Sequence, residues 1–169
     1  MNYTIGNITP FWDDSFKNFN YTKKDIDQSE INTWISQGYD YVKSFSGSLY
    51  NNQNPLPNWV YELDSKFGLK NQVYCFYKMK TLEIMPSHSD KYFKFQGLFN
   101  VPSSKICRVI LMLEDWKPGH YFELDGKGYV NWRKGDYFKW FNDCKHAAAN
   151  IGIEDRYTLQ ITGESVEHI

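Results

Sequence analysis

The part of the chain that begins at residue 71 consists of short apolar or alternating segments separated by turn-forming residues. Roughly seven or eight segments follow one another with a turn signal near every tenth residue, and this spacing predicts an antiparallel sandwich or barrel. Aromatic residues make up 18% of the chain, which favours half-buried strands over helix bundles. Asp125-Gly126 and Gly135-Asp136 mark two of the turns. The expected strands are 72–85, 92–99, 105–113, 120–124, 128–132, 137–141 and 156–163, and 146–150 leads into the last of them through a turn at Gly152.

Two helices are expected ahead of these strands. The first spans about 24–39, where Thr22 and Asp25 resemble a capping box, and the second spans about 58–67, where Gly68 supplies the C-terminal cap. Each helix has an apolar face that can pack against the β-rich region. These faces consist of Ile31, Trp34 and Ile35 in the first helix and of Val60, Leu63 and Phe67 in the second.

A length of 169 residues suits one domain with its own hydrophobic core. We therefore expect a single domain over 1–169, with N-terminal helical support over about 1–70, a β core over about 71–163 and a frayed tail at 164–169. Within the support, the first twelve residues alternate weakly and predict an edge strand.

Composition narrows the class of protein. The 19 basic and 20 acidic residues give a formal charge of -1, without the clustered basic excess of a nucleic-acid-binding surface. Cys75, Cys107 and Cys144 form no CxxC pair, which argues against a disulfide framework and a cysteine zinc site. No signal peptide is visible, and no apolar run approaches the roughly 20 residues of a membrane helix. We expect a cytoplasmic protein that binds neither nucleic acid nor membranes, and its oligomeric state stays open.

The string Met85-Pro86-Ser87-His88-Ser89-Asp90 carries the most chemical information. Residues two apart in a strand point to the same face, so His88 and Asp90 can grip one metal ion. His146, after a later strand, offers a third ligand. Taken singly, each histidine has a simpler interpretation, His88 as a surface or capping residue and His146 as an ordinary partly buried side chain. Together, two histidines and one carboxylate form the facial triad of iron(II) oxygenases, with coordination positions left open.

An arginine follows the third candidate ligand at a position from which it could bind an anion beside the metal. Arg156 lies in the strand that follows His146, and a buried guanidinium beside a metal requires an anion, for which its planar fork fits a carboxylate. The competing interpretation is a salt bridge from Arg156 to Glu154 or Asp155. His120 has no carboxylate two residues away, so we interpret it as a structural or substrate-side residue.

His88-Ser89-Asp90, then His146, then Arg156 within DRYTLQITG resemble the 2-oxoglutarate- and iron(II)-dependent oxygenases, closest to the aspartyl/asparaginyl β-hydroxylase-like and prolyl-hydroxylase-like branches. The presence of a carboxylate ligand at Asp90 resembles the prolyl-hydroxylase-like branch, because members of the aspartyl/asparaginyl branch can lack this ligand. The segment 82–86, which precedes the first histidine, departs from the glycine- and tyrosine-containing segment that precedes this histidine in prolyl hydroxylases. The resemblance covers about 70–163. Residues 131–136, 141–146, Asn150 and the strand 107–111 with Arg108 resemble the first branch.

The resemblance implies a mostly β (α+β) fold whose core is a double-stranded β-helix of the jelly-roll or cupin-like type, supported by the two N-terminal helices. It implies that His88, Asp90 and His146 hold Fe(II), and that Arg156 pairs with the distal carboxylate of 2-oxoglutarate. With O₂ as the other co-substrate and ascorbate in support, the products are succinate, CO₂ and a hydroxylated substrate. Arg108 is expected to help bind co-substrate or substrate, or else to form a solvent-side ion pair. Tyr77 is expected to hydrogen-bond 2-oxoglutarate, or else to pack in the core.

Three classes of function stay open. The first is hydroxylation of an unactivated C–H bond on a peptidyl prolyl, asparaginyl or aspartyl side chain, with an extended polypeptide received near the loops 45–57 and 114–119. The same chemistry on a free amino acid or small metabolite is its variant. The second is a cupin-like metal- or ligand-binding domain without O₂ chemistry. The third is a structural β-sandwich in which His88 and His146 never meet.

Overall fold

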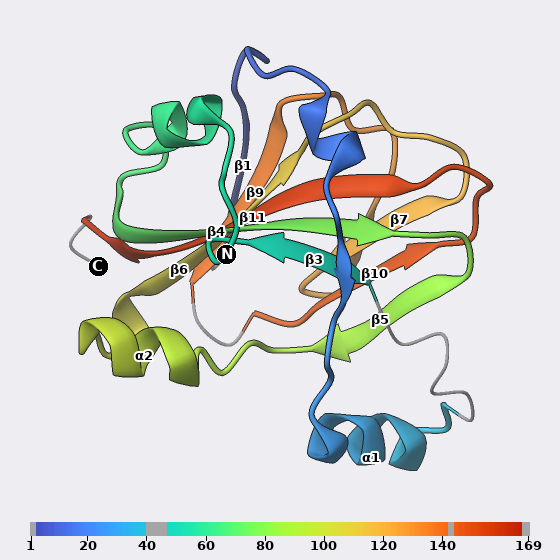
Figure 1. Cartoon of the computed structure of the whole chain (residues 1–169). Coiled ribbons are helices and arrows are strands. Elements are labelled where there is room, and N and C mark those ends of the chain that lie inside the picture. Colours follow the sequence, from blue (N-terminus) through green and yellow to red (C-terminus); the bar gives the residue numbers. More distant parts are fainter. Residues whose placement is uncertain (1–2, 40–46, 142–143, 167–169) are drawn as a thin grey trace.

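A computed structural model describes residues 3–39, 47–141 and 144–166 of the chain. Two antiparallel sheets make up most of it. The large sheet consists of β1 (Tyr3–Asn7), β2 (Thr22–Lys23), β3 (Ser48–Asn51), β4 (Leu69–Met79), β6 (Ile106–Met112), β9 (Asp136–Phe141) and β11 (Arg156–Ser165), in the order β1-β9-β6-β11-β4-β3-β2. The small sheet consists of β5 (Glu83–His88), β7 (His120–Leu124), β8 (Lys127–Tyr129) and β10 (His146–Asn150), in the order β5-β10-β7-β8 (Figure 1). The mostly β prediction is confirmed.

The large sheet is apolar on both faces, because alternate residues of its central strands are buried in different clusters. One face packs against residues of the N-terminal 3-10 helices, and the other packs against the small sheet. The first cluster includes Phe16, Val60, Leu63, Val109, Leu111, Leu159 and Ile161. The second includes Ile110, Met112, Phe122, Leu124, Phe138 and Trp140.

The two expected N-terminal helices are present in shortened form. The helix α1 (Gln28–Ser36) begins after Asp27, whose side chain accepts a hydrogen bond from the Ser29 N–H at 2.8 Å. The capping box expected at Thr22 and Asp25 is therefore wrong, because Thr22 belongs to β2 and pairs with Leu49. The second helix is a 3-10 helix, η3 (Asn58–Leu63). Two more 3-10 helices are η1 (Ser15–Asn18) and η4 (Ser103–Lys105).

The N-terminal region also adds strands to the large sheet. The expected edge strand is β1, which pairs with β9, but β2 and β3 were not expected and extend the opposite edge. Residues 1–70 are therefore not purely helical support. None of the helices in the described ranges has both the length and the apolar character needed to cross a membrane.

The segment 92–99, expected to be a strand, instead forms the helix α2 (Phe93–Phe99). Its aromatic residues also fit helical spacing, since Phe95 and Phe99 lie one turn apart with ring centroids separated by 4.7 Å. Phe95 is buried in a cluster with Val101 and Ile106. So short an apolar run is compatible with both periods, and burial of Phe95 decides in favour of the helix.

The segment 72–85, expected to be one long or bent strand, divides between β4 and β5. At the turn, Leu82 has a φ of 68°, and its N–H donates to the Asn150 carbonyl at 2.7 Å. The turn moves the chain from the large sheet to the small one. His88, at the end of β5, therefore lies in the layer opposite β4.

Both turn signals are confirmed. Asp125 and Gly126 have φ values of 52° and 74° and join β7 to β8, as a type I′ hairpin requires. Gly135 has a φ of 96°, and a Cβ there would lie 2.2 Å from the Ile8 carbonyl oxygen, so glycine is required. The tail expected at 164–169 begins later, because Glu164 and Ser165 still belong to β11, and 167–169 lie outside the described residues.

Replacing Leu111 by alanine should destabilise the protein strongly. Leu111 lies in β6 with 0% of its surface exposed, and truncating such a side chain removes buried area and leaves a cavity, at a cost of about 2–5 kcal/mol. The matched control is Leu98→Ala in α2, where the side chain is 73% exposed and the change should stay within about 0.5 kcal/mol. Urea unfolding of both variants checks this, and equal losses would contradict the assignment of the core.

Candidate metal centre

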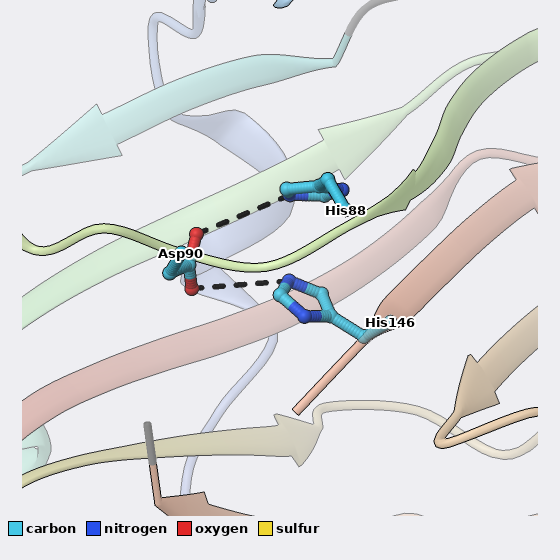
Figure 2. Close-up of side chains that lie close together, drawn as sticks. All are labelled: His88, Asp90 and His146. Atoms are coloured by element: carbon cyan, nitrogen blue, oxygen red, sulfur yellow. Dashed lines mark ion pairs between the residues drawn. The ribbon is translucent and has the colours of Figure 1, made fainter. Parts of the chain in front are cut away.

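His88, Asp90 and His146 come together at the end of the small sheet. The two histidines occupy paired positions on β5 and β10, with ring centroids 4.4 Å apart. β5 ends at His88, so Asp90 lies two residues beyond the strand, not within it as expected. Figure 2 shows the Asp90 carboxylate directed at both rings, with Oδ1 3.9 Å from His88 Nε2 and Oδ2 3.8 Å from His146 Nε2.

The donor atoms of this group are close enough to share one metal ion. One ligand atom from each of the three side chains lies within 4.8 Å of the others. The Asp90–imidazole distances of 3.9 and 3.8 Å fall within the separation of about 4 Å that two metal–ligand bonds of about 2.0–2.2 Å allow. The group can therefore hold a metal, as the sequence predicted.

Backbone carbonyl groups orient both imidazole rings. The Nδ1–H of His88 donates to the Pro86 carbonyl at 2.7 Å, and the Nδ1–H of His146 donates to the Cys144 carbonyl at 3.2 Å. Because a carbonyl oxygen only accepts hydrogen bonds, each ring carries its proton on Nδ1. The unprotonated Nε2 of each ring then faces Asp90, and such an outer hydrogen bond is the usual support of a metal-binding histidine.

The environment of the rings keeps them neutral. Burial lowers the pKa of His146 to about 4 and also lowers the pKa of His88. Two tryptophans contribute to this burial. The ring centroid of Trp34 in α1 lies 6.1 Å from that of His88 in an edge-to-face arrangement, and the ring centroid of Trp140 in β9 lies 5.0 Å from that of His146. Neutral imidazole is the form that binds a metal.

Asp90 keeps its charge despite burial. Burial by itself would raise its pKa, but Arg108 and the two histidines together hold the pKa of Asp90 well below its usual range. Arg108 donates to Oδ2 of Asp90 from Nε at 3.0 Å and from Nη2 at 2.8 Å, while its Nη1 donates to Thr162 Oγ1 at 2.6 Å. Arg108 therefore forms an ion pair inside the protein, not the solvent-side pair that was one of its two expected roles.

A cavity of about 250 Å³ opens beside this group. Both sheets contribute to its wall, together with one residue that follows β2. A second cavity of about 290 Å³ lies beside Asn71 and Tyr74 and contains none of the candidate residues. The wall of the first cavity includes Lys24, Cys75, Tyr77, His88, Asp90, Arg108, His146, Arg156, Thr158, Gln160 and Thr162.

Arg156 enters this cavity without an anionic partner among the described residues. Its surface is only 4% exposed, its Nε makes no hydrogen bond, and its Nη1 reaches Met79 Sδ at 3.4 Å. The guanidinium carbon lies 5.4 Å from the ring centroid of Trp132 and 6.0 Å from that of Phe122. Burial lowers the pKa of Arg156 to about 10, because no carboxylate among the described residues offsets the desolvation of its charge.

The salt bridges considered for Arg156 do not form. Asp155 pairs with Lys78 at 2.7 Å, and Glu154 pairs with Lys117 at 3.0 Å. The buried hydroxyl of Tyr77 likewise has no hydrogen-bond partner in the described ranges, although its ring packs in the core. The Arg156 guanidinium and the Tyr77 hydroxyl can therefore both donate a hydrogen bond to a ligand in this cavity, such as a bound carboxylate.

His120 and Asn150 have structural roles next to the site. His120 Nε2 lies 3.0 Å from the Glu154 carbonyl. The amide of Asn150 donates to the carbonyls of Met79 and Glu154, at 2.9 and 2.8 Å, and its oxygen accepts from the Gly152 N–H. These bonds fix the loop before β11, and therefore the place of Arg156.

Sequence reasoning did not single out several cavity residues. On β11, Thr158, Gln160 and Thr162 alternate with buried Leu159 and Ile161. This polar alternation in an otherwise buried strand was a usable signal for a cavity wall. Lys24 gave no such signal, because only long-range packing brings its segment here. Residues 45–46, 142 and 143, which belong to the expected substrate loop and the family-like stretch, lie outside the described residues.

Acid should destabilise the metal-free protein through its buried histidines. The unfolded pKa of a histidine is about 6.5, whereas that of His146 in the folded protein is about 4. Between these values only the unfolded chain binds the proton, so the free energy of unfolding falls as the pH drops from 7 to 5, by about 2 kcal/mol for this one group. Urea unfolding at both pH values checks this. His146→Gln should reduce the loss, and an unchanged pH dependence in that variant would contradict the assignment.

Comparisons with known proteins bear on the fold. No protein-family model matches the chain, and no curated protein sequence matches it. A Pseudomonas putida prolyl-4-hydroxylase structure is 12% identical and aligns with a TM-score of 0.54 over 90% of this chain and 96% of that one. A predicted oxalate decarboxylase from Thermotoga maritima is 13% identical, with a TM-score of 0.43 over 70% of this chain and 81% of that one. KdgF from Halomonas sp. is 10% identical, with a TM-score of 0.44 over 76% and 86%. The chain has a double-stranded β-helix fold, as the sequence predicted.

Proposed function

We propose that the chain is a 2-oxoglutarate- and iron(II)-dependent dioxygenase that hydroxylates an unactivated C–H bond. The observation that carries the proposal is the Arg156 guanidinium, which has no anionic partner among the described residues and is buried in the same cavity as two histidines and a carboxylate. A purely structural β-sandwich gains nothing from a buried cation without an anion, since such a charge costs free energy. A site that binds a dicarboxylate between a metal and an arginine requires both features.

The candidate ligands suit iron(II). Two neutral imidazoles and one carboxylate form the donor set of non-haem iron oxygenases, and they leave positions for other ligands. When bound, Fe(II) supplies, with 2-oxoglutarate and O₂, the oxidising chemistry that turns a C–H group into an alcohol while succinate and CO₂ are released. His88 and His146 would bind through Nε2. Asp90 would bind through Oδ1, because Oδ2 already accepts two hydrogen bonds from Arg108.

The remaining cavity residues bind and orient the co-substrate in this proposal. Arg156 Nε and the Tyr77 hydroxyl make no hydrogen bond to the part of the chain that the structure describes, and they would donate to the distal carboxylate of 2-oxoglutarate. Trp132 and Phe122 flank the guanidinium and hold it away from water. Arg108 has a different role, because its donors are engaged by Asp90 and Thr162, so it keeps the metal-binding carboxylate ionised and oriented.

The substrate in this proposal is a peptidyl prolyl, asparaginyl or aspartyl side chain, or a free amino acid or small metabolite. A metal- or ligand-binding domain without O₂ chemistry would share the three ligands. Such a domain would not require Arg156 in the same cavity. An assay of turnover distinguishes the dioxygenase from the binding domain.

Succinate formation tests the proposed chemistry. The purified protein, supplied with Fe(II), ascorbate, O₂ and 2-oxoglutarate, should release succinate slowly even without a primary substrate. Asp90→Ala and His146→Ala should abolish this release, and Glu62→Ala, which removes an exposed carboxylate far from the cavity wall, should leave it intact. Metal binding without succinate in the wild-type protein would favour the binding domain instead.

Replacing Arg156 by methionine should weaken 2-oxoglutarate use about 10- to 100-fold, as expected for the loss of a charge-assisted hydrogen bond of about 1.5–3 kcal/mol. Tyr77→Phe should have a smaller effect, of several-fold, because a neutral hydroxyl is lost. The concentration of 2-oxoglutarate that gives half-maximal succinate release measures both. Arg156→Met should not lower the stability of the ligand-free protein, since it removes an uncompensated buried charge. An unchanged 2-oxoglutarate requirement would contradict the assigned role.

A further inference from the structure

Lys24 is a second cation that faces the cavity. It follows β2, and its backbone N–H donates to the Gly47 carbonyl at 2.8 Å, which fixes its main chain beside β3. Its side chain is half-buried and is joined to no other described residue by an ion pair or a hydrogen bond. Burial lowers the pKa of Lys24, and the charges of Asp90 and Glu30 act against this effect. A lysine that lines a cavity without an ion pair can pair with an anionic ligand bound there.

The charges around the cavity leave Lys24 uncompensated. Three cations, Lys24, Arg108 and Arg156, face the cavity, together with the single carboxylate of Asp90. Arg108 pairs with Asp90, and Arg156 is assigned to the co-substrate. Fe(II) and doubly ionised 2-oxoglutarate add no net charge when both are bound. The described part of the cavity wall therefore keeps an excess of positive charge, to which Lys24 contributes without an ion pair of its own.

Lys24 and Arg156 belong to different parts of the cavity. Arg156 and Gln160 lie on the same face of β11, four residues apart, which is about 13 Å at a rise of about 3.3 Å per residue. Gln160 pairs with Cys75 on β4 and with Ile110 on β6. The charges of Asp90 and Arg108 act on Lys24, and so does Cys75, the β4 partner of Gln160. Lys24 therefore belongs to the part of the cavity beyond the candidate metal ligands, where a primary substrate would lie.

We infer that Lys24, assisted by Gln160, receives a carboxylate of the primary substrate. The Gln160 side chain also lines the cavity and makes no hydrogen bond to the described residues, so its amide can donate beside the ammonium group. This inference rests on the proposed function and narrows it to acidic substrates. An aspartyl side chain or the free carboxylate of a small acid fits, whereas a prolyl or asparaginyl side chain within a peptide offers no such anion.

Matched pairs of acids and amides test the inference on the full chain. The probes are the aspartyl and asparaginyl N-acetyl amides, which differ in a side-chain carboxylate, and N-acetylalanine with N-acetylalaninamide, which differ in a main-chain carboxylate. Calorimetry measures their binding to the protein loaded with Mn(II) and 2-oxoglutarate. In at least one pair the acid should bind about tenfold more tightly than the amide. The pair that shows the preference identifies the source of the carboxylate.

Variants of Lys24 connect this preference to one residue. Lys24→Met should remove the preference, Lys24→Arg should retain it, and neither should change the affinity for 2-oxoglutarate. The control Lys70→Met removes a surface lysine that pairs with Glu164 and should have no effect. Circular dichroism confirms that the variants are folded.

The outcomes separate this inference from the proposed function. If the wild-type protein binds neither Mn(II) nor 2-oxoglutarate, both are wrong. If it binds both ligands but neither acid is preferred, or if Lys24→Met keeps the preference, the inference alone is wrong. If Lys24→Met weakens 2-oxoglutarate binding instead, Lys24 belongs to the co-substrate site, which also overturns the inference.

Discussion

The pairing of β5 with β10 is the constraint on which the candidate site depends. It places His88 directly opposite His146, and a slip of one residue would turn one of the two side chains to the other face of the sheet. The pairing is itself possible only because the turn at Leu82 transfers the chain from one sheet to the other. The geometry of the group is therefore a property of the fold as a whole, not of the string that contains His88 and Asp90.

Burial has opposite effects on the groups in the cavity, and neighbouring charges decide the result. His88 and His146 are kept neutral because desolvation outweighs the attraction of Asp90. Asp90 stays ionised because Arg108 outweighs desolvation. Arg156 has no such partner within the described ranges, so its charge is poorly compensated there. The same apolar surroundings thus prepare two neutral ligands, one anionic ligand and one cation ready for an anion.

Much of the fold could be predicted because it depends on local signals. The hairpin at Asp125-Gly126 and the turn at Gly135 require specific backbone conformations, and the chain supplies residues that adopt them. The segment 92–99 was misassigned because an aromatic run of that length satisfies both helical and strand spacing, and only the burial of Phe95 distinguishes them. The strands β2 and β3 carry no periodic signal in so few residues.

The candidate site divides in the same way. His88, Asp90, His146 and Arg156 could be proposed because each stands in a recognisable place along the chain, and the structure brings them to one cavity. The partner of Arg108 could not be predicted, because Asp90 follows β5 of the small sheet whereas Arg108 lies in β6 of the large sheet. Lys24 was missed for the same reason, since its position depends on how β2 docks against β3.

Pro86, whose carbonyl oxygen orients His88, also lies in β5, the first strand of the small sheet. A strand at the margin of a sheet presents N–H and C=O groups that can recruit a strand of another molecule, and proline interrupts that row because it has no N–H. The residue that sets the imidazole tautomer therefore also makes this margin a poor template for intermolecular β-pairing. The chain can keep a metal ligand in an edge strand of its smaller sheet with a reduced risk of aggregation.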